Sequence, residues 1–372
     1  MRKKYFLNFF LVIMSLALSS CVSQEQFCKA VRYVDGYDNG DEVCASGVVG
    51  ASRSIRLEET EACRLHSVRK VVIRHGKIYA LNENMMKTSI YIYDMKGKFL
   101  GKIGEMGAAQ NEYLYIDTFC FDDKGRLYLF DGNKRKIMIY NAEGEFLDRK
   151  NYLRDHMVAD IEYVGEDSLL VCNGFDNNVP IYEIYDIAKD CKTALTNTVI
   201  KPKDGVIGAK RHPVSIYKDK IRYMIPFENV IYDMNNSEDF CVQTSEKIFS
   251  REEICSEYYE EMADKTWKGY FPGFDGVYET DKYVIVPVRF SVLFIDKESN
   301  KLFRHRWEEN HTYILWQLCA SYGNTIVSLY DPDYLDHLKR MDCKQFLTSI
   351  CGRNYTESDL NSHYLVFHEL KK

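Results

Sequence analysis

Four glycines, Gly97, Gly101, Gly104 and Gly107, lie between two aromatic-rich runs and raise the question of a phosphate-binding loop. The backbone N–H groups of a glycine-rich loop hold phosphate when the glycines follow GxGxxG or GxxxxGKS and a helix begins directly after them. These glycines follow neither spacing, and no helical pattern comes after them. Because glycine between alternating runs is the ordinary mark of a turn, we predict turns between strands and no phosphate site.

Other local signatures of catalysis are missing from the sequence. It contains no GxSxG, HExxH or SxxK motif, no CxxC and no Cys/His spacing of a zinc site. Each of the nine histidines is isolated, so we expect structural or surface roles for them. A cluster of glutamates fits the solvated face of a helix better than a cation site; its members are Glu252, Glu253, Glu257, Glu260 and Glu261. We therefore expect neither a metal ion nor a cofactor.

The best candidate for recognition is the segment 266–276, TWKGYFPGFDG, which follows an expected helix at 250–263. Its aromatic residues are Trp267, Tyr270, Phe271 and Phe274. Aromatic rings on a loop can stack on a sugar or grip an apolar side chain of a peptide, so these four are the predicted ligand-binding residues. The alternative is that they attach the helix to the body of the protein, since the helix must bury Ile254, Tyr258 and Met262.

The N-terminus has the pattern of a targeting segment. Three basic residues at 2–4 precede an apolar run at 5–18, which ends in small residues directly before Cys21. Residues 1–20 are therefore predicted to be a signal peptide. The segment LSSC resembles the lipobox of bacterial lipoproteins, which implies that Cys21 is lipidated and anchors the mature chain in a membrane. Residues 21–55 are interpreted as a tether.

Charge and cysteine content narrow the class of protein further. The net charge is −6 with lysine and arginine scattered along the chain, which argues against a nucleic-acid partner. Of the 12 cysteines, Cys21 is assigned to lipidation, and most of the others are interpreted as small buried residues. Export makes disulfides possible, with Cys343–Cys351 or Cys28–Cys44 as candidate pairs.

A repeated pattern predicts the architecture. A hydrophobic strand that ends in an aromatic residue or Ile followed by Asp or Asn recurs along the chain, at Tyr93-Asp94, Tyr140-Asn141, Tyr185-Asp186, Tyr232-Asp233 and Ile295-Asp296, with Phe367-His368 as a sixth copy. The spacings are 47, 45, 47, 63 and 72 residues. Four antiparallel strands with their turns occupy a length in the forties, which is one blade of a propeller. The fold class is therefore all-β, a six-bladed β-propeller over residues 56–372.

The two long spacings are explained by helices inserted in the last two blades. In the first, Ser250 and Glu253 form a capping-box pattern. In the second, Asp331 precedes a proline at the first helical position, and a further helix ends at Gly352. Residues 54–74 are long enough to supply a strand to the last blade, which would close the ring and remove two exposed edges.

The run GKFLGKIGEMGAAQNEYLYIDTFCFDDKGRLYLFDGNKRKIMIYNAEGEFL, at 97–147, resembles the six-bladed β-propeller lipoproteins of Bacteroidetes-type gut bacteria, relatives of the NHL-repeat proteins. In that family a glycine-rich connector ending in Gly-Glu-Tyr joins the early blades. This chain has Ala109-Gln110-Asn111 where the family usually has Gly-Pro-Gly, and Ser362 at a usual proline near the closing strand. The resemblance implies the fold and an envelope location, and it implies no catalytic residue.

These observations predict an envelope lipoprotein, anchored through Cys21 and sorted to the outer membrane, that acts as a non-catalytic binding or scaffold module. The expected partner is a glycan, a peptide or another envelope protein, bound on the face that carries the helical inserts. The competing hypothesis is an enzyme, a metal-dependent lactonase or other hydrolase or a lyase, with its site at the mouth of the channel. A third is a structural part of an outer-membrane complex.

Overall fold

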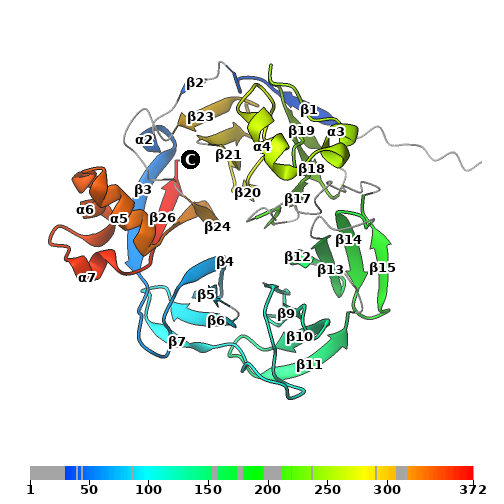
Figure 1. Ribbon diagram of the computed structural model, residues 1–372, viewed down its shortest axis with the longest axis vertical. Coiled ribbons are helices and arrows are strands. Elements are labelled where there is room, and N and C mark those ends of the chain that lie inside the picture. Colours follow the sequence, from blue (N-terminus) through cyan, green and yellow to red (C-terminus); the bar gives the residue numbers. More distant parts are fainter. Residues whose placement is uncertain are drawn as a thin grey trace, which may run out of the picture.

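The computed structural model describes residues 30–38, 41–42, 45–85, 87–152, 158–173, 179–196, 212–218, 220–235, 238–289, 291–306, 315 and 317–371. Within these residues six β-sheets stand around a central axis, each forming one blade of a closed ring (Figure 1). The prediction of a six-bladed β-propeller is confirmed.

The first three blades each contain four antiparallel strands, which follow one another from the axis outward. Blade one consists of β4 (Ser67–Arg74), β5 (Lys77–Asn84), β6 (Lys87–Asp94) and β7 (Phe99–Lys102). Blade two consists of β8 (Thr118–Phe121), β9 (Leu127–Asp131), β10 (Lys136–Tyr140) and β11 (Phe146–Asn151). Blade three consists of β12 (Val158–Gly165), β13 (Ser168–Asn173), β14 (Tyr182–Asp186) and β15 (Cys191–Ala194).

The last three blades also use strands from the N-terminal part of the chain. Blade four consists of β16 (Val214–Tyr217), β17 (Lys220–Met224), β18 (Val230–Asp233) and β19 (Asp239–Val242), with β1 (Val31–Val34) outside them. Blade five consists of β20 (Tyr278–Glu279), β21 (Tyr283–Val288), β22 (Ser291–Asp296) and β23 (Leu302–Arg306), with β2 (Asp41–Glu42) outside. Blade six consists of β24 (Leu318–Tyr322), β25 (Thr325–Tyr330), β26 (Tyr364–Leu370) and β3 (Val49–Arg56), which the short helix α2 (Ala45–Val48) precedes.

The repeated aromatic-Asp pair has a local structural cause. Asp94 ends the third strand of blade one, and its Oδ1 accepts hydrogen bonds from the backbone N–H groups of Lys96 and Lys98, at 2.8 and 2.9 Å. Asn141 makes the same turn in blade two, with the N–H groups of Glu143 and Glu145. A short carboxylate or amide side chain therefore holds the turn to the outer strand, as Asp and Asn commonly do.

The hydrophobic core is divided among the interfaces between neighbouring blades. The buried cluster between blades one and two includes Tyr79, Phe119 and Met138, for example. Equivalent clusters fill the other blade interfaces, including the one between blades six and one, where Ile55 of β3 is buried. Each blade therefore buries both faces against its two neighbours.

A strand from before blade one joins the last blade, as predicted, but it lies mostly ahead of the predicted segment 54–74 and also corrects the assigned domain boundary. β3 pairs with β26 along Val49–Arg56, and β1 pairs in parallel with β19. The assignment of 21–55 to a tether is therefore wrong for residues 31–34, 41–42 and 49–55, which belong to the propeller. The error has a physical cause, because an outermost strand is half exposed and its alternation of apolar and polar residues is weak. The signal peptide at 1–20 and Cys21 lie outside the described residues.

Helices occur where the long spacings predicted them. α3 (Arg251–Ser256) begins with the predicted capping box, in which Ser250 Oγ accepts from Glu253 N at 3.1 Å. However, the chain breaks at Tyr258 and continues as α4 (Tyr259–Thr266), so Tyr258 is exposed while Ile254 and Met262 are buried. In blade six α5 (Pro332–Arg340) and α6 (Lys344–Cys351) confirm the predicted pair, and α7 (Glu357–Leu360) is additional. No helix in the described ranges has the length and apolar content needed to cross a bilayer.

The antiparallel order of the strands defines two faces of the ring. The turns between the first and second strands of the blades, and those between the third and fourth, lie together on what we call the turn face. The connection that carries α3 and α4 runs from β19 to β20, and the one that carries α5, α6 and α7 runs from β25 to β26. Both connections lie on the opposite face, which we call the helix face and which is turned toward the viewer in Figure 1.

Candidate functional site

A cavity of about 390 Å³ lies at the centre of the ring. Its walls come from the innermost strands β4, β8, β12, β16 and β24. Arg74, His75 and Asp123, at the first turns of blades one and two, are among its lining residues, so the cavity opens on the turn face. The cavity therefore opens on the face opposite the helical inserts, whereas recognition was expected on the face that carries them.

A buried ion cluster forms the deep part of the cavity. Lys70 Nζ lies 2.6 Å from Asp160 Oδ1 and 2.7 Å from Glu162 Oε1, and it also donates to the carbonyl oxygen of Ile161 at 3.3 Å. Thr118 Oγ1 donates to the same Asp160 oxygen at 2.5 Å. The cluster therefore links blade one to blade three past the inner strand of blade two.

The local backbone explains why these charged side chains reach the axis. The pairing of β4 with β5 shifts register between Val68 and Lys70, and the pairing of β12 with β13 shifts between Val158 and Asp160. Such β-bulges change the direction of a side chain relative to the regular alternation of a strand. Both members of the shortest ion pair in the cluster therefore stand beside an irregular step in a strand.

Burial and the neighbouring charges bring the pKa of the Glu162 carboxyl group close to neutral pH. Burial alone would lower the pKa of Lys70, but the carboxylates of Asp160 and Glu162 outweigh it and hold that pKa above its ordinary value. Burial raises the pKa of Glu162 to about 7, with the charge of Asp160 acting in the same direction and Lys70 opposing it. Among the described residues, Asp160 Oδ2 has no hydrogen-bond partner.

The raised pKa of Glu162 predicts a pH dependence of stability. Because the folded protein holds this proton more tightly than the unfolded chain, the stability that Glu162 contributes is complete below about pH 4.5 and is lost as the pH rises through about 7. We expect the free energy of unfolding of the wild type to fall by about 1–3 kcal/mol relative to that of Glu162→Gln between pH 5 and pH 8. Urea denaturation at intervals of one pH unit measures this difference.

The matched control for this pH dependence is Glu143→Gln. Glu143 also forms an ion pair with a lysine, Lys77, but it is exposed on the ring surface. The free energy of unfolding of Glu143→Gln, plotted against pH, is expected to run parallel to that of the wild type. If the Glu162→Gln and wild-type curves were parallel over this range, Glu162 would not titrate there.

Two other titratable side chains line the cavity in neutral form. Burial lowers the pKa of His212 to about 4, and its ring stacks on Tyr278 with 4.5 Å between centroids. Burial raises the pKa of the Cys120 thiol well above its ordinary value, so this thiol is a poor nucleophile. In the part of the chain that the structure describes, no group of three or more His, Cys, Asp or Glu side chains is placed to hold a metal ion.

The mouth of the cavity combines aromatic and apolar side chains with the charged residues Arg74 and Asp123. Tyr163 of β12 and Tyr322 of β24 line it from blades three and six, which are opposite each other in a six-bladed ring. Tyr322 is 48% exposed, and Ile216 of blade four is also exposed at the mouth. Tyrosine rings above and a charged cluster below give a site that can stack on a ring and hydrogen-bond to its polar groups.

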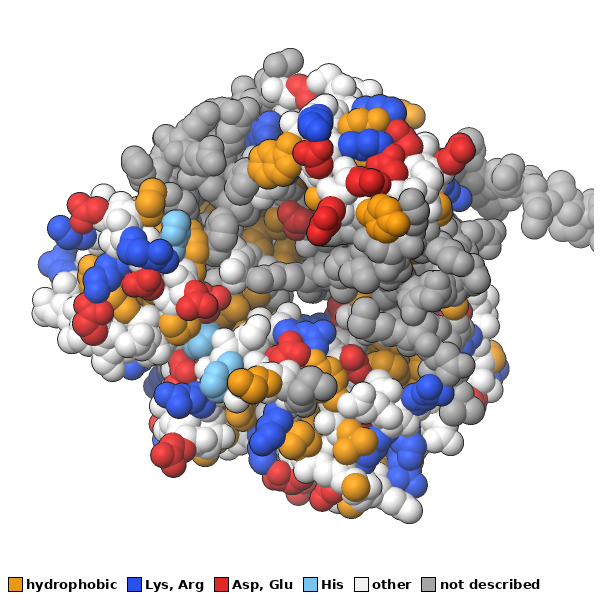
Figure 2. Space-filling model, in the orientation of Figure 1, with side chains coloured by type: hydrophobic (Ala, Val, Ile, Leu, Met, Phe, Trp, Pro, Cys, Tyr) orange, Lys and Arg blue, Asp and Glu red, His pale blue; other side chains and the backbone are white. Residues whose placement is uncertain are grey.

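The four aromatic residues predicted from sequence are separated by the fold. Trp267 is 69% exposed at the end of α4, on the helix face, where Figure 2 shows hydrophobic side chains among acidic and basic ones over α3 and α4. Phe271 and Phe274 are fully buried in the cluster between blades four and five. Their assignment as ligand-binding residues is therefore corrected, because no ligand can reach them in this conformation.

Tyr270 attaches the inserted helices to the ring. Its ring packs on Phe249 at 4.6 Å, and its hydroxyl lies 3.0 Å from Glu253 Oε1 and 2.6 Å from Lys247 Nζ. The alternative role, attachment of the helices, is thus the one that the structure supports for this residue. Only Trp267 among the four is exposed.

The cysteine assignments have mixed outcomes. Cys343 and Cys351 are free thiols that pack against the cluster of α5, α6 and α7, so this candidate disulfide is wrong. Cys120 is buried in β8, as expected of a small apolar residue. Cys28 and Cys44, the other candidate pair, have no described side chains.

The central cluster has no local signature in the sequence. Lys70 and Asp160 are 90 positions apart, and neither stands in a recognisable motif. The one available signal was a charged residue inside an apolar strand pattern, in SVRKVVIR at 67–74 and VADIEYVG at 158–165. A charge at such a position is costly to bury without a partner, so it indicates pairing across the axis.

Comparison with known proteins agrees with the fold. A crystal structure of a Bacteroides fragilis protein named as an inferred exported protein is 15% identical, covers 92% of this chain and all of that one, and has a TM-score of 0.69. A Bacteroides vulgatus member of the DUF4221 family is 11% identical, covers 87% of this chain and 97% of that one, and has a TM-score of 0.53. No curated protein matches the sequence.

At these identities the two structures establish a shared fold and nothing about activity. The family comparison is more specific, because a single model covers most of the propeller, from the segment before β1 to the start of α6. The model is that of a domain of unknown function, and it matches residues 29–345. The chain therefore belongs to the DUF4934 family.

Proposed function

We propose that this protein is a non-catalytic binding module of the bacterial cell envelope, and that it binds a neutral saccharide unit at the mouth of its central channel. The observation that carries the proposal is the pairing of tyrosines on opposite sides of the mouth with a charged cluster beneath them. Sugar rings present apolar faces to aromatic side chains and hydroxyl groups to carboxylates and ammonium groups.

The size and charge of the cavity support a neutral ligand. A volume of about 390 Å³ lies at the lower end of the range for small-molecule sites and suits one or two sugar rings. Lys70 faces two carboxylates, of which Glu162 is partly protonated at neutral pH, and Arg74 stands near the opening. The charges at the floor nearly cancel, so a ligand with a strong charge of either sign gains little there.

The envelope location rests on the N-terminus and on the similar protein from Bacteroides fragilis. A basic start, an apolar run and a cysteine after small residues make an exported, lipid-anchored chain the best account of residues 1–21. The name of the Bacteroides fragilis protein refers to export as well. Anchoring at the outer membrane through Cys21 is part of the proposal, and so is the likeness to NHL-repeat lipoproteins.

Mutation of the channel mouth tests the saccharide proposal. Neutral mono- and disaccharides are expected to raise the melting temperature of the protein by binding the folded state. Tyr322→Ala is expected to weaken the binding about threefold to tenfold, from the loss of ~0.5–1.5 kcal/mol of stacking, with little effect on stability because Tyr322 is half exposed. Titration calorimetry with the most effective sugar measures the change in Kd.

Two control variants make the result specific. Tyr33→Ala removes a tyrosine of similar exposure, 59%, from β1 on the outside of the ring, and it is expected to leave Kd unchanged. Trp267→Ala removes the exposed aromatic residue of the helix face. If Trp267→Ala abolished binding while Tyr322→Ala did not, the binding site would be the aromatic loop and the channel proposal would be wrong.

Glu162 favours one alternative, a propeller enzyme. A carboxyl group with a pKa of about 7 beside a lysine can transfer a proton at neutral pH. Slow conversion of a bound saccharide or lactone that Glu162→Gln abolishes, while Kd stays the same, would favour this alternative. A stable complex with unchanged ligand supports the binding module.

A further inference from the structure

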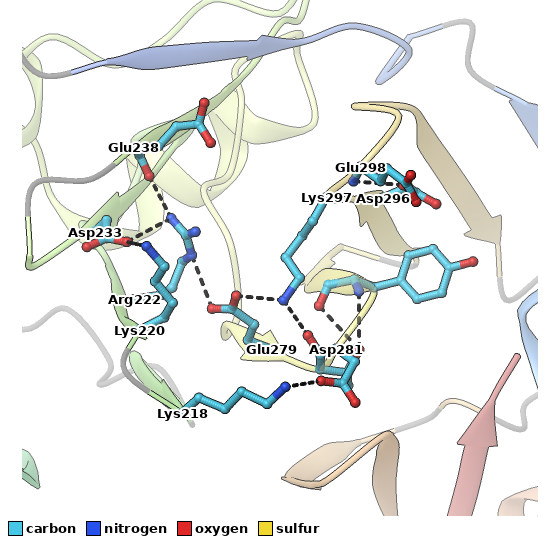
Figure 3. Close-up of polar contacts among 12 residues, drawn as sticks. Lys218, Lys220, Arg222, Asp233, Glu238, Glu279, Asp281, Asp296, Lys297 and Glu298 are labelled. Carbon is cyan, nitrogen blue, oxygen red and sulfur yellow. Dashed lines mark hydrogen bonds and ion pairs between the residues drawn. The ribbon is translucent and has the colours of Figure 1, made fainter. Parts of the chain in front are cut away.

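A second cavity, of about 280 Å³, lies between blades four and five on the turn face (Figure 3). Five basic side chains line it, and they come from β1, the turn between β16 and β17, β17 itself and the turn between β22 and β23: Arg32, Lys218, Lys220, Arg222 and Lys297. We refer to this cavity as the basic cleft. The carboxylates at its lining are fewer, namely Glu238, Glu279 and Asp281.

Arg222 is the central group of the basic cleft. Its side chain is 4% exposed, its Nε donates to Glu279 Oε2 at 3.1 Å, and its Nη1 donates to the carbonyl oxygen of Glu238 at 2.7 Å. Nη1 also lies 3.5 Å from Asp233 Oδ2. Among the described residues Nη2 has no hydrogen-bond partner, and Figure 3 shows this nitrogen without a contact, facing the space between Glu238 and Lys297.

The neighbours of Arg222 hold it in place. The Phe240 ring lies 4.7 Å from the guanidinium carbon of Arg222 and 5.4 Å from that of Arg32. Ser215, the cross-strand partner of Arg222, is buried, and its Oγ has no hydrogen-bond partner among the described residues. A rigid, nearly buried guanidinium with spare donors is the arrangement that recognises oxyanions in proteins.

The charges of the basic cleft favour an anion although the whole chain is acidic. The five cations face three carboxylates at the lining. The fully buried Asp233, behind Arg222, is a fourth carboxylate. The chain as a whole carries a net charge of −6, so the cleft is a local positive region in a negative protein. Partial exclusion of water strengthens the attraction between such a site and an anion.

The existing ion pairs do not close the basic cleft to a ligand. Lys218 pairs with Asp281, and both side chains are more than half exposed. Exposed pairs of this kind contribute little to stability and exchange readily with other partners. Lys297 Nζ is held by Glu279 Oε1 at 3.0 Å and the Thr280 carbonyl oxygen at 2.5 Å, which leaves its third proton for a ligand.

We propose that the basic cleft binds an oxyanion group, as a carboxylate, sulfate or phosphate substituent of a ligand. The proposal rests on residues other than those of the channel mouth and goes beyond the function proposed above. Consecutive residues of β16 nevertheless connect the two sites, since Ser215 and Ile216 line the channel cavity and Tyr217 lines the basic cleft.

The test is titration of the purified full-length protein with inorganic phosphate, inorganic sulfate and glucuronate, with glucose as the uncharged comparison, at constant ionic strength. At least one anion is expected to bind. The double variant Lys218→Gln/Lys220→Gln is expected to raise its Kd about tenfold, because charged hydrogen-bond donors are lost. Both lysines are partly exposed, so this variant is expected to fold.

Lys77→Gln is the matched control. Lys77 begins the second strand of blade one as Lys220 begins that of blade four, their side chains are 29% and 35% exposed, and each pairs with a carboxylate. Its Kd for the anion is expected to equal that of the wild type.

The outcomes separate this proposal from that of the channel. Binding of phosphate and sulfate supports a tetrahedral group, and binding of glucuronate alone supports a carboxylate. No binding of any of the three anions overturns the proposal, as does an equal loss in Lys77→Gln, which would indicate a general effect of charge. Loss of anion binding in Tyr322→Ala would place the anion in the channel and overturn it too, whereas loss of neutral-sugar binding alone in that variant leaves the basic cleft unaffected.

Discussion

Replacing Lys70 by methionine is expected to lower the free energy of unfolding by about 3–5 kcal/mol, a large part of the stability of a typical domain. Methionine preserves most of the volume of lysine but leaves Asp160 and Glu162 without their cation. Both carboxylates lie within 2.7 Å of Lys70 Nζ, and Asp160 is almost completely buried. Removing one partner of a buried ion pair leaves an uncompensated charge in a region of low dielectric constant, which is the reason for the large effect.

Urea denaturation of Lys70→Met at pH 5 and pH 8 measures this effect. The loss is expected to be smaller at pH 5, where Glu162 is protonated and only Asp160 needs a cation. The triple variant Lys70→Met/Asp160→Asn/Glu162→Gln is expected to regain much of the stability, because it removes the buried charges together. Lys102→Met, which breaks the exposed pair with Glu105, is the control and is expected to change stability by less than ~1 kcal/mol. A loss below ~1 kcal/mol in Lys70→Met would contradict a role of the cluster in holding blades one and three together.

A chain that begins at Leu57 is expected to lose cooperative folding. This truncation removes β3, which pairs with β26 along Val49–Arg56, and it removes Ile55 from the cluster between blades six and one. Burying one large aliphatic side chain stabilises by about 1.5–3 kcal/mol and each ladder hydrogen bond by about 0.5–1.5 kcal/mol. Over eight residues these terms are comparable with the whole net stability of a domain, about 5–15 kcal/mol, and β26 would become an exposed edge.

A chain that begins at Ala45 is the matched comparison for this truncation. It lacks β1 and β2, which lie outside blades that already have four strands, but it keeps β3. Its melting temperature is expected to fall while the transition stays cooperative. Near-ultraviolet circular dichroism and calorimetry measure the cooperativity of unfolding of both chains. A sharp transition in the chain beginning at Leu57 would show that β3 is not needed to close the ring.

The error at Tyr258 illustrates the limit of periodicity. Ile254, Tyr258 and Met262 have helical spacing, and the first and last are buried as a helix would bury them. The chain nevertheless breaks at Tyr258, where a second helix begins with a cap of its own, and Ile254 and Met262 both pack in the cluster between blades three and four. Spacing indicates which residues must be buried, and the shape of the surface beneath decides whether one helix can bury them.

The aromatic loop shows the same limit for residue type. Aromatic residues beside glycine and proline suit either ligand binding or packing, because both remove the ring from water. The closure of blades four and five buries Phe271 and Phe274 and leaves Trp267 exposed. Nothing within the loop distinguishes these residues, since the difference depends on blades that are built from other parts of the chain.

Local sequence patterns predict the six-bladed architecture, whereas the residues of the two sites come together only when the ring is assembled. Blades one and two are encoded locally, by strand alternation and by an Asp or Asn whose side chain bonds to backbone N–H groups two and four residues ahead, at Asp94 and Asn141. The channel cluster and the basic cleft have no such local code. Lys70 meets Asp160, and Arg222 meets Glu279, only because the ring closes, and two β-bulges direct the first of these pairs inward. Contacts between distant strands depend on the geometry of the whole ring, so a short stretch of sequence does not predict them.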